Sequence, residues 1–157
     1  MIKKMLAGLV IVLGVVNMAL GVAFIAIGET KQSYLQTTMD QEKITLTLSE
    51  EQVAAGDFID TATEAQAAGD LVREHRHAMG TYNEVLGGGK FDPTVPEQLT
   101  YGQALNLENY LYLAVASFGL TTVAVVAGVG MLVTGIGLAL VGGFLLFWWR
   151  KPQPAEA

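Results

Sequence analysis

The feature that most constrains this chain is an apolar run over residues 111–149, which contains no charged side chain and is closed by Arg150 and Lys151. A helix needs only about 20 apolar residues to cross a hydrocarbon core of about 30 Å. The run is therefore too apolar for the surface of a soluble domain and too long for one simple span. It predicts an integral membrane protein in which the long second helix begins outside the bilayer.

A second apolar segment covers residues 5–27 and follows Lys3 and Lys4. The apolar part of a secretory signal peptide is usually about 7 to 15 residues long, and this segment is longer. We therefore predict an uncleaved membrane anchor. Cleavage after a small residue such as Ala23 or Ala26 is the alternative interpretation.

The basic residues at the two ends of the chain predict its topology. Lys3 and Lys4 precede the first apolar segment, and Arg150 and Lys151 follow the second. By the positive-inside rule, both termini lie in the cytoplasm and the chain crosses the cell inner or plasma membrane more than once. A rival interpretation divides the long run near Gly128 into two spans.

Small residues recur every seven positions in both apolar segments, which places them on one face of a slightly underwound helix. One strip consists of Ala7, Gly14, Gly21 and Gly28, and the other of Ala114, Thr121, Gly128, Gly135 and Gly142. Because small residues let helices approach closely in a membrane, the strips predict an antiparallel two-helix hairpin. The predicted helix-packing residues are Gly14, Asn17, Gly21, Gly28, Gly128, Thr134, Gly135 and Gly142.

Asn17 is the one strongly polar side chain in the first apolar segment. An amide without a partner costs free energy in hydrocarbon, so Asn17 is expected to bond across the helix pair. Aligning the charged ends of the two helices places Asn17 level with Gly137 and one turn from Thr134. We predict a hydrogen bond to the Thr134 hydroxyl or to a carbonyl near Gly137. A polar point on a transport path is the alternative role.

The middle of the chain is acidic and contains no cysteine. Residues 29–108 hold 14 acidic and 5 basic side chains, and the whole chain has a net charge of −6. This charge disfavours nucleic-acid binding and keeps an exposed domain soluble beside a membrane. The absence of cysteine excludes disulfides, thiolate metal sites and cysteine nucleophiles.

The middle region is expected to be mostly helical. Residues 29–42 continue the first helix, and Ser49 with Gln52 fits a capping box. Residues 43–48 alternate polar and apolar side chains, which predicts one short strand or an extended segment. An amphipathic helix over residues 61–79 is expected to bury Ala65, Ala68, Leu71, Val72 and His75. A last helix is expected to begin near Thr100 and to continue into the apolar run.

No group of residues predicts catalysis, cofactor binding or metal binding. His75 and His77 are two positions apart and point to different sides of a helix, unlike the i, i+4 pair of a zinc helix. We expect His75 to pack inward and His77 to be solvated. The loop at Gly87 and Lys90 lacks the spacing of a phosphate-binding loop. We therefore predict that the chain is not an enzyme.

The order of several short motifs resembles a family of small uncharacterised actinobacterial membrane proteins with two spans. The motifs are Glu42-Lys43-Ile44-Thr45, Thr81-Tyr82-Asn83-Glu84 and Ala114-Val115-Ala116-Ser117-Phe118-Gly119. Some members of that family are named after aromatic ring-opening dioxygenases, whereas this sequence shows no iron-ligand set. The resemblance implies the two-span arrangement and carries over no functional residue.

Together these features predict an all-α membrane protein, an antiparallel transmembrane hairpin with a small, mostly helical extracytoplasmic domain. The predicted parts are an N-terminal anchor (1–28), the acidic domain (29–110), the long second helix (111–151) and a cytoplasmic tail (152–157). The expected function is that of a non-enzymatic accessory, scaffold or interaction protein of the cell envelope, with the lipid bilayer and a protein partner or further copies of itself as partners. A subunit of an oligomeric transporter or pore is the alternative, which would need several copies to surround a path.

Overall fold

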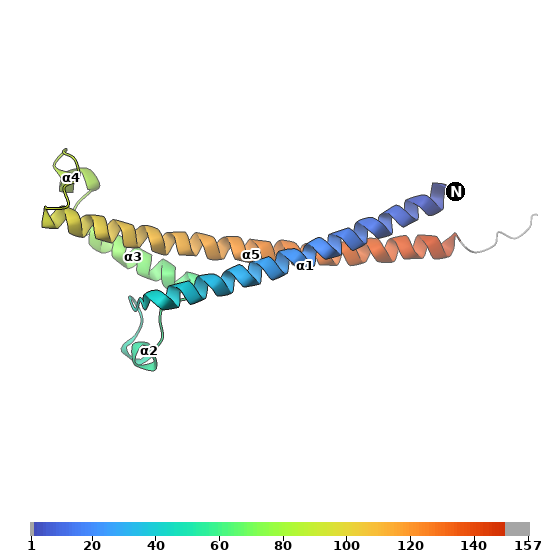
Figure 1. The fold of residues 1–157 in the computed structure, drawn as a ribbon, viewed down its shortest axis with the longest axis horizontal. Helices are drawn as coiled ribbons and strands as arrows, with labels where there is room; N and C mark the ends of the chain where they lie inside the picture. The colour runs from blue at the N-terminus through green and yellow to red at the C-terminus, as the bar shows by residue number, and fades with distance from the viewer. Residues whose placement is uncertain (1, 150–157) are drawn as a thin grey trace, which may run out of the picture. The chain divides into compact units, whose positions relative to one another are not determined.

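The computed structural model describes residues 2–149, and within that range its regular structure is entirely helical. The helices are α1 (Ile2–Glu42), α2 (Glu50–Ala55), α3 (Ala62–Ala78), α4 (Tyr82–Leu86) and α5 (Pro96–Trp148) (Figure 1). The all-α prediction is thus confirmed for the described residues. The predicted tail, residues 152–157, and the flanking Arg150 and Lys151 lie outside them.

Helices α1 and α5 are both long and apolar enough to cross a membrane. In the most apolar stretch of each, only 11% of the residues are buried, whereas the core helix of a soluble protein would be mostly buried. This exposure favours a membrane setting for both helices. Helix α5 continues without a break through Gly128, so the rival division of the apolar run into two helices is wrong.

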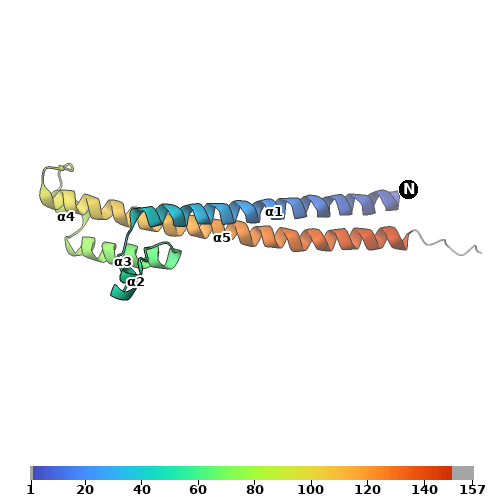
Figure 2. The same cartoon turned by 60° about the horizontal axis from the view of Figure 1, so that its bottom comes forward.

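The chain forms two compact units, and the first combines Met1–Thr30 with Thr121–Ala157. Within its described part, the segments of α1 and α5 lie side by side in Figures 1 and 2. Gly28 of α1 lies against Thr121 of α5, and Gly142 lies against Ala7. The two segments therefore run in opposite directions.

The second unit, Lys31–Leu120, holds the hydrophobic core. Its buried centre is formed by Ile59, Ala65, Ala68, Val72 and Leu111, and it is surrounded by Met39, Ile44, Leu46, Leu48, Ala104, Leu107, Ala114 and Val115. These side chains come from the end of α1 and the segment that follows it, from α3 and its preceding loop, and from the first part of α5. Figure 2 shows α3 alongside α5. The predicted continuation of α1 to residue 42 is confirmed, and it contributes to this core.

Local sequence signals explain where the shorter helices begin. Ser49, Thr61 and Thr81 each accept a hydrogen bond from the third backbone N–H of the following helix in a reciprocal capping box, so α2, α3 and α4 start at these positions. Helix α5 starts at Pro96 rather than near Thr100. Proline suits the first position of a helix because its fixed φ is already helical and its missing N–H would have no partner there.

Residues 43–48 were predicted as one short strand or an extended segment, and the strand is wrong. The segment turns on itself, and both Lys43 (φ 51°) and Thr47 (φ 69°) adopt the left-handed conformation. Its link to the rest of the unit includes one backbone hydrogen bond, from Ile59 N to Ile44 O at 2.9 Å. Alternate residues reach the core because the chain turns, so the period-two pattern arises without a pleated strand.

Candidate functional site

The predicted small-residue strips meet at the centre of the first unit, where the backbones of α1 and α5 touch. A Cβ atom built on Gly14 would lie 2.7 Å from Gly135 O, and one built on Gly135 would lie 2.7 Å from Gly14 O. Gly21 and Gly128 show the same reciprocal distance of 2.7 Å. Real Cβ atoms essentially never come this close to another heavy atom. The helix spacing at these two levels therefore requires glycine on both sides.

We call the contact between α1 and α5 along these small residues the glycine seam. The tight packing continues toward both of its ends. A Cβ atom on Gly28 would lie 2.7 Å from Val125 Cγ2, and one on Gly142 would lie 2.6 Å from Ile11 Cγ1. Six of the eight residues predicted for helix packing thus lie in the seam. They are Gly14, Gly21, Gly28, Gly128, Gly135 and Gly142.

Of the other two predicted packing residues, Thr134 differs from expectation, and the hydrogen bond predicted for Asn17 stays a prediction. Thr134 is exposed, and its hydroxyl donates to Gly130 O of its own helix at 2.8 Å. Adjacent positions of a helix point about 100° apart, so Thr134 turns away from the face on which Gly135 lies. Asn17 is partly buried on α1. Aligning the charged ends of the two helices therefore predicted how far along the helix pair Thr134 lies, but not which face of α5 it occupies.

The histidine expected to pack inward does not do so. His75 is exposed, and the buried residue at that end of α3 is its neighbour Arg76. His77 is exposed, as expected. Among the described residues, no three His, Asp or Glu side chains are grouped closely enough to hold a metal ion.

Arg76 forms a buried ion pair that sequence reasoning did not find. Its Nε donates to Glu108 Oε2 at 2.6 Å, and its Nη2 donates to Glu108 Oε1 at 3.2 Å. Its Nη1 donates to Tyr101 Oη at 2.5 Å. Arg76, Glu108 and Tyr101 are only 9%, 6% and 2% exposed. This bidentate geometry fixes both the distance and the orientation of α3 on α5.

The surroundings of Arg76 favour its charged form. The hydrogen bond to Glu108 is the main reason that its pKa is raised, and burial opposes this rise. His77 Nε2 lies 3.1 Å from Arg76 Nη2, and since a guanidinium can only donate, this nitrogen is the acceptor. The Tyr82 ring of α4 lies 6.0 Å from the Tyr101 ring. We call Arg76, Glu108, Tyr101, His77 and Tyr82 the arginine cluster.

A second polar network joins α3 to α5 at Asp70. Asp70 Oδ1 accepts from Tyr112 Oη at 2.6 Å and from Arg73 Nη2 at 2.9 Å, while Oδ2 accepts from Gln66 Nε2 at 3.1 Å. These bonds stabilise the carboxylate, and the one from Tyr112 contributes most to lowering the pKa of Asp70. Gly69 lies beside this network, where a Cβ atom would come within 3.2 Å of the Tyr112 ring. Glycine thus allows the Tyr112 ring to lie close to α3.

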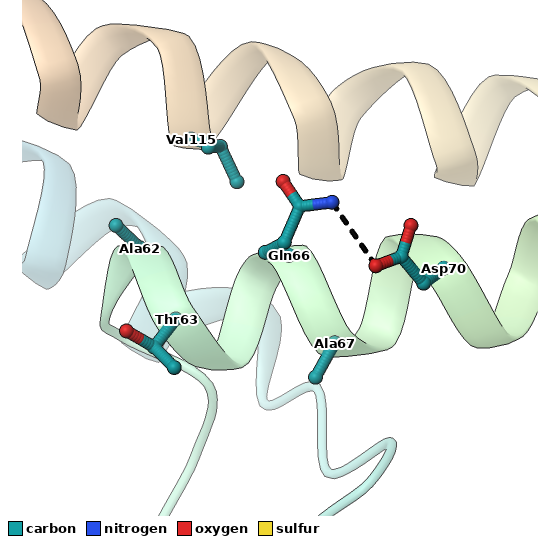
Figure 3. Close-up of a pocket in the computed structure, with 6 residues that line it drawn as sticks. All are labelled: Ala62, Thr63, Gln66, Ala67, Asp70 and Val115. Atoms are coloured by element: carbon teal, nitrogen blue, oxygen red, sulfur yellow. Dashed lines mark hydrogen bonds between the residues drawn. The ribbon is translucent and has the colours of Figure 1, made fainter.

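Asp70 is one wall of a shallow groove of about 430 Å³, and Figure 3 shows the residues that line it. It is lined by Ala62, Thr63, Gln66, Ala67 and Asp70 of α3 and by Val115 of α5. The Gln66 amide is turned toward Asp70 and is held there by the hydrogen bond drawn in Figure 3. The Gln66 amide and the Asp70 carboxylate are therefore bound to each other, which suits a structural contact better than a reactive site.

The arginine cluster had a partial signal in the sequence. Ala65, Ala68, Val72 and Arg76 are spaced three and four positions apart and so share one face of α3. A charged residue that continues an apolar stripe requires a buried partner. That partner, Glu108, lies 32 positions further along the chain, and no local pattern identifies it.

Comparison of this chain with protein-family models, with curated proteins and with solved structures gave no match. The resemblance to the actinobacterial family therefore stays a prediction from the three motifs that carry it.

Proposed function

We propose that the chain is an integral protein of the cell inner or plasma membrane, in which α1 and α5 form an antiparallel transmembrane hairpin. Both termini lie in the cytoplasm, and the second unit is extracytoplasmic. The protein acts as a non-enzymatic accessory or scaffold that binds a partner within the membrane.

The observation that carries this proposal is the reciprocal backbone contact at Gly14 with Gly135 and at Gly21 with Gly128. In lipid, helices associate through van der Waals packing rather than through the hydrophobic effect, and close backbone approach is the usual means. A seam of this kind supports a hairpin that needs no further helix to hold it together. The remaining faces of both helices are mostly exposed, so they are free to contact lipid or a partner.

The second unit supports the same role. The ion pair between Arg76 and Glu108 is buried and bidentate, and Tyr101 completes the bonding of the guanidinium. Buried ionic groups can specify one arrangement of a core over others, and here they would hold α3 in a single register on α5. A domain fixed in this way can present a constant surface to a partner.

The test is purification of the full-length chain from its native membrane with an affinity tag in the loop at Gly88. Native mass spectrometry in a gentle detergent then gives the composition and stoichiometry of the complex. We expect a heteromeric complex with a defined stoichiometry. A closed homo-oligomer that conducts ions in liposomes would overturn the accessory role and support the alternative, a pore subunit.

The seam provides a control for the same measurement. Gly128→Leu places bulk inside the helix contact, whereas Gly137→Leu places it where no atom lies within 4 Å. We expect the partner to be lost with the first change and kept with the second. Equal loss of the partner with both variants would mean that the partner binds the face on which Gly137 lies. The contact within the seam would then not be what partner binding depends on.

A further inference from the structure

A half-enclosed groove of about 430 Å³ lies in the second unit, between the end of α1 and the first part of α5. This volume is within the range of about 300–1,000 Å³ that is typical of small-molecule sites. Its walls are mainly apolar and include Met39, Ile44, Leu107, Leu111 and Ala114. Thr38 also lines it, but its hydroxyl donates to Tyr34 O at 2.8 Å, so its hydrogen is already used within α1.

The charge at this groove has one sign. Glu42 is the only charged side chain that lines it, and among the described residues Glu42 takes part in no ion pair. Tyr110 also lines the groove and is 70% exposed, so its ring is accessible. An aromatic face attracts a cation, and so does a carboxylate. The excess of acidic side chains in residues 29–108 raises the local concentration of cations further.

We infer that this groove binds a single-chain amphiphile with a positively charged head, such as a long-chain alkylammonium. The hydrocarbon chain lies along the apolar wall between Met39 and Leu111, and the head lies beside Glu42 and the Tyr110 ring. The wall that α5 contributes from Leu107 to Ala114 is about 10 Å long, which gives several methylene groups contact at once. An anionic head is disfavoured because no basic side chain within residues 2–149 lines the groove.

This inference does not depend on the proposed scaffold role, since it concerns residues of the second unit alone. Its test uses the full-length chain in lipid nanodiscs and three photoreactive probes. The probes share one decyl chain with a diazirine at its end, and they carry a trimethylammonium, a hydroxyl or a sulfate head. Mass spectrometry locates the labelled residues. Partition of each probe into the bilayer is the same for all variants, so comparison of variants cancels it.

We expect the trimethylammonium probe to label residues 38–44 and 107–114 most strongly. Glu42→Gln and Tyr110→Leu should each reduce this labelling by about twofold to fivefold and leave labelling by the hydroxyl probe unchanged. Both side chains are exposed, so these changes are compatible with folding. The matched controls are Glu51→Gln, which removes an exposed charge from α2, and Tyr34→Leu, which removes a ring of similar exposure outside the groove.

The inference is overturned if the three heads label the groove equally, because the groove would then bind any hydrocarbon chain. It is also overturned if the control variants lose as much labelling as Glu42→Gln and Tyr110→Leu. Labelling confined to other exposed apolar residues of α5 would show that the chain does not enter the groove.

Discussion

Substitution of Gly135 by alanine adds one methyl group where the backbones of the glycine seam are in close contact. The new Cβ atom would lie 2.6 Å from Met18 Cγ, 2.7 Å from Gly14 O and 2.8 Å from Met18 N. The Met18 side chain can move, but the other two atoms belong to the backbone of α1. The helices must therefore separate at this level. Gly137→Ala makes the same chemical change where nothing lies within 4 Å, so it serves as the control.

The magnitude follows from the difference between these two variants. Alanine is favoured over glycine in a helix by up to about 1 kcal/mol, and this gain is common to both positions. Forcing a group of this size into a packed contact costs about 1–3 kcal/mol. We therefore expect Gly135→Ala to be less stable than Gly137→Ala by about 1–3 kcal/mol. Gly135→Leu should cost more, and also more than Asn17→Leu, because bulk in the seam separates the helices along their length.

Stability can be measured by thermal unfolding of the full-length chain in a neutral detergent. Because the chain contains no cysteine, one introduced cysteine on each helix also allows spin labelling and a direct distance measurement. We expect this distance to increase in Gly135→Ala and to stay unchanged in Gly137→Ala. Equal stabilities and equal distances in the two variants would refute the seam as the contact that holds the helices together.

Four further predictions concern the second unit. Arg76→Met should lower the free energy of unfolding by about 3–5 kcal/mol, measured with denaturant, because it leaves Glu108 buried without its partner. Adding Glu108→Leu should recover part of that loss. Equal losses of stability in the single and the double variant would contradict this prediction. Burial and neighbouring acids raise the pKa of Asp60, so its ionised form destabilises the fold. The protein therefore gains stability as the pH falls through the folded pKa of Asp60. Asp60→Asn should raise the melting temperature at pH 7 but not below about pH 3. The pKa of Asp70 is lowered in the folded state. Its contribution to stability is therefore present above the unfolded pKa of about 3.9 and is lost as the pH falls through the folded pKa. Asp70→Asn should lower the melting temperature at pH 7, and a higher melting temperature would contradict this prediction. A reporter inserted at Gly88 should be accessible only from the extracytoplasmic side, and access from the cytoplasm would overturn the topology.

The parts of the structure that follow from local sequence were predictable. The seven-residue spacing of the glycines is a property of each helix alone, so it can be recognised without knowing which helices meet. The capping box at Ser49 was found from its sequence, and the same Thr-x-x-Glu signal precedes α3 at Thr61 and α4 at Thr81. Those two helix starts were available to the same reasoning.

The parts that depend on how distant segments meet were not predictable in this way. The ion pair of Arg76 with Glu108 requires the return of the chain after α4, and the sequence between them does not specify which acid will face α3. The turning segment 43–48 has the alternation of a strand because alternate residues meet the core, which the pattern alone cannot distinguish from a pleated backbone. Thr134 is a third example. A strip of small residues identifies one face of a helix, but it does not show whether a residue next to the strip also reaches the partner helix.

The position of Glu108 on the last helix also determines when the second unit can fold during synthesis. The chain is made from its N-terminus, so α3 with Arg76 emerges before Leu111 and Glu108 exist. Until α5 is made, the guanidinium stays hydrated and the apolar face of α3 has no partner. A chain that stops before α5 therefore keeps this face exposed, which makes it a substrate for chaperones and proteases. Synthesis of the last helix is thus the step after which the second unit can bury its apolar face and resist degradation.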